Sequence, residues 1–433
     1  MPWRLDAGDP RFETAFAEFL GVRRGTDDDV AATVSAIIAE VRENGDAALI
    51  AACERFDRVR LTAETLAVPA HDLAAAHSAL APEVQSALEM AAARIRDFHI
   101  RQLPDDLHFD DDAGVTLGYR WTPLASVGVY VPGGTAAYPS SVLMNVVPAR
   151  VAGVERVVMT VPAPDGRLDS LVLAAAHLAG VDAVYRVGGA QAVAALAFGT
   201  ATIATVDKIV GPGNAYVAEA KRQVFGTVGI DLIAGPSEIL VLADAGNDPA
   251  WIAADLLAQA EHDASAQAIL VTDDAAFADA TLEAVDRHLK VLPRADIAYA
   301  SWRDYGAVIV VPALADAVAL IDRIAPEHLA LAIENAEEIA FRVRNAGAIF
   351  LGRHTPEALG DYVAGPNHVL PTGGSARFSS GLGVFDFIKR TSLIGCDASG
   401  LRTLGPAAIT LAEAEGLHAH ALSVAIRLRA DEG

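Results

Sequence analysis

Two polar residues that suit metal binding, Gln259 and His262, are three positions apart in the run IAADLLAQAEH. On a helix this spacing puts both side chains on one face, beside the apolar Ile252 and Leu256. A core histidine whose hydrogen bonds are satisfied explains one such residue without any ligand. The pair therefore predicts polar side chains inside the fold and leaves their chemistry open.

Further donors occur later in the chain: Asp361 and His368 in a long loop, and His418 and His420 near the C-terminus. Most protein zinc sites have four ligands, and histidine and carboxylate are common among them. An amide oxygen such as that of Gln259 is a poor donor for this metal. Spacing alone makes a zinc site one interpretation beside the structural one.

The adjacent pair Glu327 and His328 follows Pro326 in the run IAPEHLAL. Proline fixes its own φ and restricts the residue before it, so the acid and the imidazole are presented at a constrained turn. Such a pair can relay protons near neutral pH. The alternative is an ordinary helix N-terminus in which the glutamate stabilises the helix dipole, and from these residues alone we favour that alternative.

Glycine-rich turns follow three apolar runs that are typical of buried strands. In VDKIVGPGNAYVAEAKRQ, Gly211 and Gly213 stand between a predicted strand and a helix, where N-terminal amides can bind a phosphate. VGGAQ repeats the arrangement at Gly188 and Gly189, and VYVPGGTAAYPSS adds a strand end that carries Tyr130. Any one such turn also occurs without a ligand. Together they favour a nucleotide crevice, although the full GxGxxG motif is absent.

Asp231 stands about where an acid would bind the ribose of a dinucleotide, but a strand-end aspartate is common without that role. Cys53 and Cys396 are the only cysteines, which excludes a disulfide framework and a zinc site built mainly from thiolates. Both lie outside the glycine-rich turns. If the protein oxidises an aldehyde, we therefore expect a water adduct activated by Glu327 or His328 rather than a thiohemiacetal.

The elements that must position these residues alternate between short β-branched runs and alanine-rich helices, which is typical of parallel α/β structure. One block of predicted strands is ASVGVYVP, ERVVMTVP, DAVYRVGG and DKIVGPG, and a second is EILVLAD, QAILVTD, AVIVVP and GAIFLG. Helices are expected at about 249–262, 275–290, 314–323 and 334–345. The segment 352–383 is rich in Gly, Pro and Ser and is predicted to be a functional loop.

Composition narrows the function classes. The 433 residues carry 33 Lys and Arg against 56 Asp and Glu, a formal charge of −23, which would repel a polyphosphate partner, so no nucleic-acid binding is expected. No stretch approaches the roughly 20 apolar residues of a membrane span, and MPWRLDAGDP lacks an apolar secretion segment. We expect a cytoplasmic protein, without membrane contact, that acts on small solutes.

Several long runs together resemble the histidinol dehydrogenase family. They are GVYVPGGTAAYPSSVLMNVVPARVAGV, VGGAQAVAALAFGT, DKIVGPGNAYVAEAKRQVFG, GPSEILVLAD, QAEHDASAQAILVT, PEHLAL and GDYVAGPNHVLPTGGSARFSSGLGVFDFIKRTS. The resemblance is colinear from about residue 25 to the C-terminal tail. It implies NAD-dependent, four-electron oxidation of L-histidinol through L-histidinal to L-histidine, the last steps of histidine biosynthesis, with two NAD⁺ reduced per product.

The resemblance also implies a role for individual residues. A zinc ion would hold the imidazole and amine of the substrate, and Glu327 and His328 would transfer protons. The implied zinc ligands, which also contact the substrate, are Gln259, His262, Asp361 and, contributed by the other subunit of a homodimer, His420. Further substrate contacts are Ser237, His328, His368 and Glu415, and the NAD contacts are Tyr130, Gln191 and Asn214.

The implied fold is α/β: an intertwined homodimer with two incomplete Rossmann-like parallel-sheet domains and small terminal helical or dimerisation segments. We expect an N-terminal arm at 1–25, a first Rossmann-like domain made of 26–110 and 236–383, a second at 111–235 on the NAD side, and a dimerisation segment at 384–433.

Three alternatives remain open. A relative could oxidise another amino or sulfonated alcohol with the same zinc, NAD and Glu–His pair. A zinc hydrolase could use Glu327 to activate metal-bound water, and a silent protein could only bind a small molecule. Production of NADH discriminates against the last two.

Overall fold

The computed structural model describes residues 2–22, 28–133 and 138–430 of the chain. Two units separate by their internal contacts, Met1–Arg101 with Ala125–Phe387 and Gln102–Leu124 with Ile388–Gly433. The first unit contains two six-stranded sheets, named here sheet A and sheet B, and the second contains a three-stranded sheet. Each unit is described by itself.

Sheet A consists of six parallel strands. In spatial order they are β1 (Trp3–Asp6), β12 (Ala307–Val310), β11 (Gln267–Thr272), β10 (Glu238–Ala243), β13 (His328–Ala332) and β14 (Ala348–Leu351). From β12 to β14 the order along the chain is 3-2-1-4-5, that of a doubly wound sheet. All six residues of β10 are buried, as expected for a strand covered on both faces.

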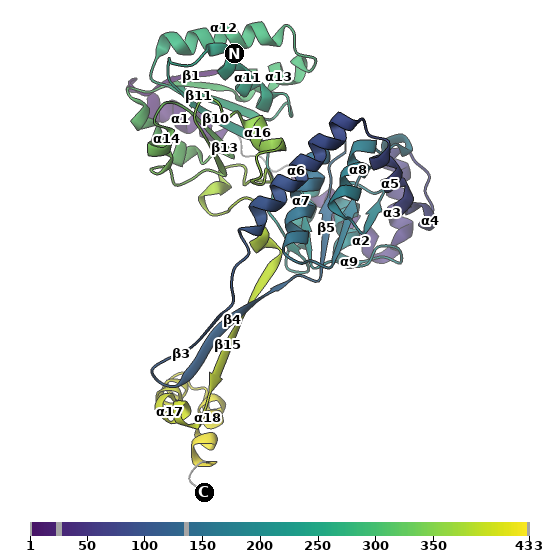
Figure 1. Cartoon of the computed structure of the whole chain (residues 1–433), viewed down its shortest axis with the longest axis vertical. Coiled ribbons are helices and arrows are strands. Elements are labelled where there is room, and N and C mark those ends of the chain that lie inside the picture. Colours follow the sequence, from purple (N-terminus) through teal and green to yellow (C-terminus); the bar gives the residue numbers. More distant parts are fainter. Residues whose placement is uncertain (1, 23–27, 134–137, 431–433) are drawn as a thin grey trace. The chain divides into compact units, whose positions relative to one another are not determined.

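Helices cover both faces of sheet A, and Figure 1 shows α11 and α12 on the opposite side from α1 and α14. The first group is α11 (Pro249–Ala260), α12 (Ala275–Leu289) and α13 (Ala295–Tyr305), and the second is α1 (Phe12–Gly21), α14 (Ala317–Ile324) and α15 (Ala336–Ala340). The remaining pieces are α16 (Glu357–Tyr362) and the 3₁₀ turns η3 (Leu314–Asp316), η4 (Ser375–Arg377) and η5 (Val384–Asp386). The predicted loop 352–383 therefore contains one short helix.

Sheet B repeats the 3-2-1-4-5 order and adds one antiparallel edge strand. Its strands are β2 (Ala67–Val68), β7 (Ala183–Tyr185), β6 (Arg156–Thr160), β5 (Ser126–Tyr130), β8 (Lys208–Val210) and β9 (Gly229–Ile230). Its helices are α2 (Asp28–Asn44), α3 (Asp46–Ala52), α4 (Ala63–Leu66), α5 (Ala70–Ser78), α6 (Pro82–Ile100), α7 (Pro139–Val151), α8 (Ser170–Ala179), α9 (Gly189–Phe198) and α10 (Ala215–Val224), with the π-helical turn η1 (Cys53–Asp57) and the 3₁₀ turn η2 (Pro164–Gly166).

The second unit is an antiparallel sheet with two helices. Its elements are β15 (Ile388–Cys396), β4 (Val115–Pro123), β3 (Leu107–Asp110), α17 (Ala398–Ala414) and α18 (His418–Ala430). None of the described helices, in either unit, combines the length and apolar character that crossing a bilayer requires.

The α/β fold class with parallel sheets is confirmed, but the expected grouping of residues 26–110 with 236–383 is wrong. Val34 and Val41 of α2 share a core with Leu196 of α9 and Val217 of α10, so this segment covers sheet B. Both faces of sheet A are already closed by its own helices. Residues 2–22 of the expected arm 1–25 are part of that closure, since β1 pairs with β12 and α1 packs into the core of sheet A; residues 1 and 23–25 lie outside the described residues.

Candidate active site

Glu327 and His328 lie at the amino edge of sheet A, where β10 and β13 begin. One neighbour holds both side chains: the backbone N–H of Glu238 donates to Glu327 Oε2 at 2.8 Å, and His328 Nδ1 lies 2.9 Å from the Glu238 carbonyl oxygen. Glu327 is 5% exposed and His328 is 4% exposed. The acid and the imidazole are therefore buried side by side on rigid backbone.

The helix N-terminus favoured from the sequence at Pro326 is wrong. The residues that follow it form the buried strand β13, which pairs with β10 on one side and β14 on the other. Pairing with two neighbours satisfies the backbone of a short apolar run as well as a helix would, and it buries both faces of the run.

The ring proton of His328 resides on Nδ1, because the Glu238 carbonyl can only accept a hydrogen bond. Nε2 keeps its lone pair, and no hydrogen-bond partner among the described residues reaches it. Burial lowers the pKa of His328 to about 3, an effect that the hydrogen bond to Glu238 opposes and the nearby His368 and His262 reinforce. At neutral pH the imidazole is a neutral base with a free nitrogen.

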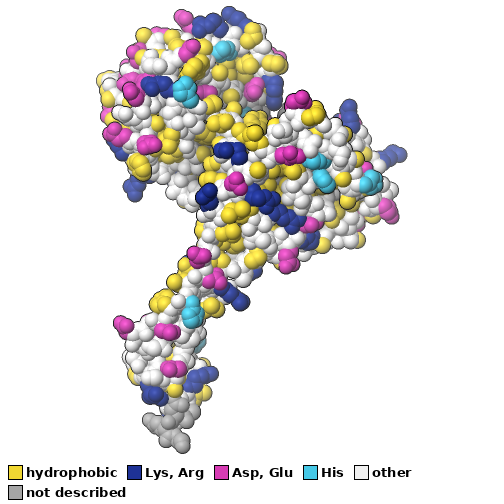
Figure 2. Space-filling view, in the orientation of Figure 1, with side chains coloured by type: hydrophobic (Ala, Val, Ile, Leu, Met, Phe, Trp, Pro, Cys, Tyr) yellow, Lys and Arg dark blue, Asp and Glu magenta, His cyan; other side chains and the backbone are white. Residues whose placement is uncertain are grey.

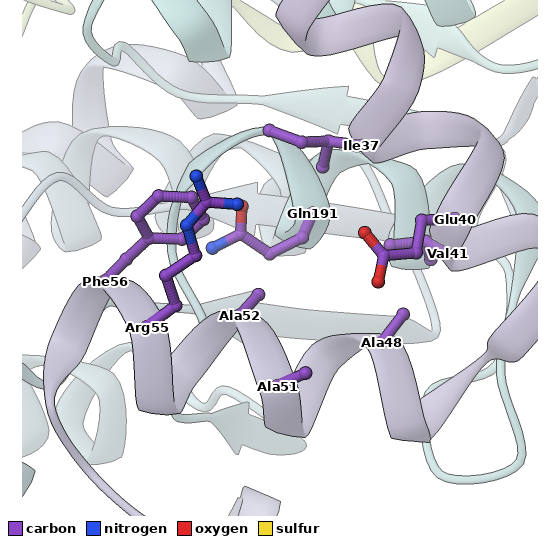
Figure 3. A pocket seen from close by; sticks show the side chains of 9 residues that line it. All are labelled: Ile37, Glu40, Val41, Ala48, Ala51, Ala52, Arg55, Phe56 and Gln191. Carbon is purple, nitrogen blue, oxygen red and sulfur yellow. The ribbon is translucent and has the colours of Figure 1, made fainter.

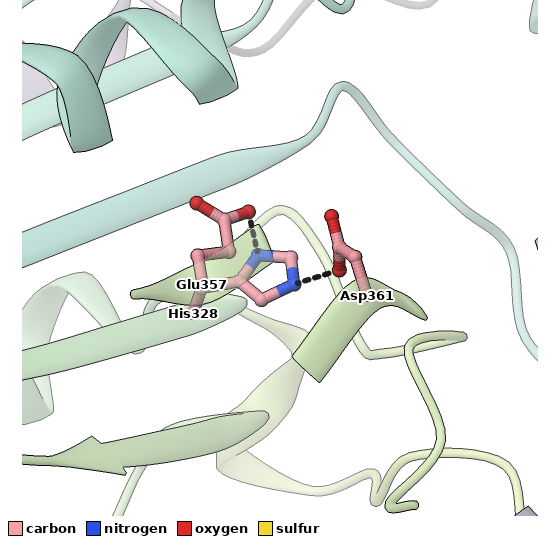
Figure 4. A group of neighbouring side chains, drawn as sticks. All are labelled: His328, Glu357 and Asp361. Carbon is pink, nitrogen blue, oxygen red and sulfur yellow. Dashed lines mark ion pairs between the residues drawn. The ribbon is translucent and has the colours of Figure 1, made fainter. Parts of the chain in front are cut away.

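Two carboxyl groups on α16 approach the two nitrogens of this ring. Glu357 Oε1 is 3.3 Å from Nδ1, and Asp361 Oδ1 is 3.8 Å from Nε2 of His328 (Figure 4). Burial raises the pKa of Glu357 well above its usual value and raises the pKa of Asp361 to about 6. Sequence reasoning missed Glu357, although its four-residue spacing from Asp361 places both acids on one helix face.

The predicted donors on α11 lie beside this cluster, since α11 packs against α16. Gln259 is 1% exposed, and its Oε1 has no hydrogen-bond donor among the described residues. Burial lowers the pKa of His262, which follows the last turn of the helix. His262 also contributes to lowering the pKa of His328 and of His368, so the three rings lie close together.

His368 completes the cluster from the long loop. Its Nδ1 lies 2.9 Å from the backbone carbonyl oxygen of Asp361, so Nδ1 is the donor and Nε2 is the basic nitrogen. Burial lowers the pKa of His368 to about 4. The ring is therefore neutral at physiological pH and can accept a hydrogen bond from a substrate.

Two overlapping donor sets could hold a metal ion. His328, Glu357 and Asp361 offer one ligand atom each, and these atoms lie within 4.8 Å of one another. The two carboxylates face different ring nitrogens, however, and Nδ1 already donates to a carbonyl (Figure 4). The set of Gln259, His262 and Asp361 carries no such conflict, and it would give the buried oxygen of Gln259 a partner.

Sheet B presents the glycine-rich turns at its carboxyl edge. Tyr130 ends β5, and its buried hydroxyl oxygen accepts from the Gly189 N–H at 3.1 Å. Asn214 caps α10, since its Oδ1 accepts from the backbone N–H groups of Tyr216 and Val217. The strand order reverses between β5 and β8, and dinucleotides bind at such switch points in doubly wound sheets.

Gln191 lies in the first turn of α9 and is 4% exposed. It lines a cavity of about 70 Å³ between α2, α3 and η1 (Figure 3). The other lining residues are Ile37, Glu40, Val41, Ala48, Ala51, Ala52, Arg55 and Phe56. The side chain of Gln191 is thus part of the wall of this cavity.

Asp231 is fully engaged by the protein itself. It forms a buried ion pair with Lys221 and accepts from the Gly211 and Leu232 backbone N–H groups at 2.7 Å each. Lys221 also donates to the Gly211 carbonyl at 3.0 Å. These contacts shape the glycine turn and account for Asp231 without a ribose.

Comparison with known proteins identifies the family of the chain. The histidinol dehydrogenase family model matches residues 22–428. A histidinol dehydrogenase of Rhizobium meliloti is 63% identical over 432 residues, 100% of each chain, and one of Rhodospirillum rubrum is 62% identical over 429 residues, 99% of each. The chain belongs to the histidinol dehydrogenase family. This confirms the predicted enzyme class, an NAD-dependent oxidoreductase of histidine biosynthesis.

A solved structure of the family supports the fold. The crystal structure of histidinol dehydrogenase from Elizabethkingia anophelis matches with a TM-score of 0.94 and 36% sequence identity, covering 100% of this chain and 99% of that one. The parallel-sheet architecture described above is therefore shared with a member of the histidinol dehydrogenase family.

The remaining predicted residues are Ser237, Glu415 and His420. Ser237 precedes β10 directly and is half-buried, with its carbonyl oxygen accepting from the Gln267 N–H at 2.9 Å. Glu415 and His420 belong to the second unit and are exposed around the turn between α17 and α18, as is His418.

Neither cysteine belongs to the cluster around His328 as the structure describes it. Burial raises the pKa of the Cys53 thiol to about 12, and the thiol donates to the Arg186 carbonyl oxygen at 3.4 Å. Cys396 lies in β15 of the second unit. A thiolate nucleophile at Cys53 is thereby excluded near neutral pH, in agreement with the expectation from its position in the sequence.

Proposed function

We propose that this protein oxidises L-histidinol through L-histidinal to L-histidine, with two NAD⁺ reduced per product and with zinc as the resident metal. The observation that carries the proposal is the pair at the start of β13: a neutral His328, whose Nε2 has no hydrogen-bond partner among the described residues, and Glu327 beside it. An alcohol-to-acid oxidation needs one base that can act twice and one group that can activate water.

The zinc ligands we propose are Gln259, His262 and Asp361, with His420 donated by the second copy of a homodimer. The buried Gln259 Oε1 without a donor and the neutral His262 suit a cation in this place. When bound, zinc would supply Lewis-acid polarisation and a fixed position for the imidazole and amine of the substrate, and NAD⁺ would accept the hydrides.

His328 and Glu327 then divide the proton transfers. His328 Nε2 takes the hydroxyl proton as the carbinol carbon gives up its hydride, which leaves the aldehyde. Glu327 takes a proton from water as its oxygen adds to the aldehyde carbon. His328, after losing its first proton to solvent, takes the proton of the hydrate hydroxyl as the second hydride leaves. Each oxidation removes two electrons, so the acid forms after four.

The other site residues position the substrate and the nucleotide. Ser237, His368 and Glu415 are proposed to contact the substrate, and Tyr130, Gln191 and Asn214 to contact NAD. Gripping one small molecule from many directions keeps the reactive aldehyde in place between the two oxidations. We further propose that the protein acts in the cytoplasm as a homodimer that assembles through its C-terminal segment.

The test is a histidinol-dependent NADH assay with and without a chelator. We expect two NADH for each histidinol consumed, histidine as the product, and loss of turnover on removal of zinc. A stoichiometry of one, or turnover of another amino or sulfonated alcohol in preference to histidinol, contradicts the proposed reaction. The hydrolase and the silent binding protein both predict no NADH.

A further inference from the structure

Asp57 is a buried carboxylate that the proposed mechanism does not use. It ends the π-helical turn η1 and is 7% exposed. Its Oδ2 has no hydrogen-bond partner among the described residues. Leaving a buried charged oxygen unsatisfied costs free energy, so such an atom points to a partner that is present only in the working state.

The chain holds Asp57 at the carboxyl edge of sheet B. The backbone N–H of Ala163, just beyond β6, donates to the Asp57 carboxylate. On the next residue, Arg58 Nε and Nη2 bind the two oxygens of Asp165 at 2.8 and 2.9 Å, which pins the end of η1 to the turn η2. Because β6 and β5 are adjacent parallel strands, this places Asp57 beside the end of β5.

The Asp57 carboxyl group lies near enough to Tyr130 to act on it electrostatically. The negative charge of Asp57 helps to raise the pKa of Tyr130, whose burial raises it to about 12, so the two groups are electrostatic neighbours. The Tyr130 oxygen accepts from Gly189, while its own proton remains on the hydroxyl. A ligand at this edge therefore meets an anionic acceptor beside a neutral hydroxyl group.

A doubly wound sheet that binds NAD commonly uses one acid at its carboxyl edge to accept from a ribose hydroxyl. In sheet B, Asp231 is the acid that the sequence offers for this role, and the ion pair with Lys221 and two backbone amides occupy it. Asp57 is buried at the same edge, and its Oδ2 has no hydrogen-bond partner in the part of the chain that the structure describes. A phosphate would be repelled there, whereas a ribose hydroxyl can donate.

We propose that Asp57 binds a ribose hydroxyl of NAD through Oδ2. The inference rests on the proposed function, because it takes NAD as the dinucleotide of sheet B. The ribose contact is thereby assigned to a residue about 170 positions before Asp231, the acid at the strand end. Asp57 lies in the turn η1 and not in sheet B.

The first experiment measures NAD binding by titration calorimetry in the wild type, Asp57→Asn and Asp57→Ala. We expect the dissociation constant to rise about tenfold or more in both variants, with zinc content and the KM for histidinol within twofold of the wild type. Glu54→Gln, at an exposed carboxylate of the same turn η1, is the matched control and should bind NAD normally. Normal NAD affinity in both Asp57 variants overturns the proposal.

The second experiment uses NAD analogues that lack one ribose hydroxyl at a time. One analogue should bind the wild type about tenfold more weakly than NAD does, and the same analogue should bind Asp57→Ala as well as NAD does. If every deletion weakens binding equally in wild type and variant, Asp57 contacts another part of the nucleotide or none. If no missing ribose hydroxyl weakens binding to the wild type, the proposal is overturned even where a variant fails to fold.

The two proposals fail differently. A wild-type protein that yields no NADH from histidinol contradicts the proposed function. A wild type that turns over normally while Asp57 and the ribose hydroxyls prove independent contradicts only the ribose contact.

Discussion

His328 owes its reactivity to a backbone carbonyl rather than to a carboxylate. The Glu238 carbonyl holds the ring proton on Nδ1 and leaves Nε2 free, and burial keeps the ring neutral. A free Nε2 suits either a base or a metal ligand, so the tautomer alone does not assign the role. In the proposed mechanism His328 is the base and His262 is a metal ligand.

Replacing each histidine separately tests this division. We expect His328→Ala to lower kcat by roughly 10²- to 10⁴-fold while retaining zinc after dialysis, because it removes the base. His262→Ala should lose the metal, because it removes a ligand. Metal analysis beside steady-state kinetics measures both. Zinc lost from His328→Ala and retained by His262→Ala would favour the alternative set with Glu357 and Asp361.

Asp255 lies on α11, four residues before Gln259. Its ionisation makes the free energy of unfolding depend on pH. Burial raises its pKa from 3.8 to about 6, so the folded chain binds more protons than the unfolded chain between these values. The contribution of Asp255 to stability is therefore fully present below pH 3.8 and is lost as the pH rises through about 6.

We therefore expect Asp255→Asn to stabilise the metal-free protein by roughly 1–3 kcal/mol at pH 8. The gain should shrink as the pH falls toward 4. Urea unfolding at a series of pH values measures the difference. A gain of the same size at pH 4 and pH 8 would show that ionisation of Asp255 is not its cause.

At the scale of elements, the strand-to-helix turns of sheet B are built around close backbone contact. Gly211 follows β8 with φ +111°, and a side chain there would overlap the Tyr130 carbonyl oxygen. The Asp231 carboxylate accepts from the Gly211 N–H, so the turn is fixed from both sides. Glycine is therefore needed at position 211 for the close packing of the backbone, whether or not a phosphate binds there.

Gly226 gives a matched control, because its φ of +100° is similar and a Cβ there would meet nothing within 4 Å. We expect Gly226→Ala to cost about 1 kcal/mol of unfolding free energy through backbone strain alone. Gly211→Ala should cost several kcal/mol and weaken NAD binding. Chemical denaturation and NAD titration measure the two effects; equal costs would show that the close contact relaxes freely.

At the scale of the larger unit, sheets A and B have the same core strand order, but the proposed NAD contacts lie at the carboxyl edge of sheet B and the Glu327–His328 pair lies at the amino edge of sheet A. At the carboxyl edge of sheet A, Arg353 Nη2 binds Asp244 at 2.7 Å, and Asn247 Nδ2 donates to the Ala332 carbonyl at 2.6 Å. These contacts tie β10, β13 and the loop after β14 together where a nucleotide would otherwise bind. In sheet A the candidate active-site residue His328 lies at the opposite, amino edge.

The proposed homodimer predicts complementation between two inactive variants. If the fourth ligand comes from the partner, a hybrid of His262→Ala and His420→Ala chains contains one intact site and one doubly defective site. Refolding an equal mixture should then restore about a quarter of the wild-type turnover. Mixtures that remain inactive, although hybrid dimers form, would place His420 in the site of its own chain.

The amino-acid sequence by itself determined the family and the parallel α/β class, since these depend on local periodicity and on long specific runs. It did not determine which sheet the segment 28–100 covers, because an apolar helix face fits any open sheet face. Nor did it identify Glu357 and Asp57, each unremarkable in its own helix. Only the tertiary structure decided those points, because burial and a missing partner arise when distant segments meet.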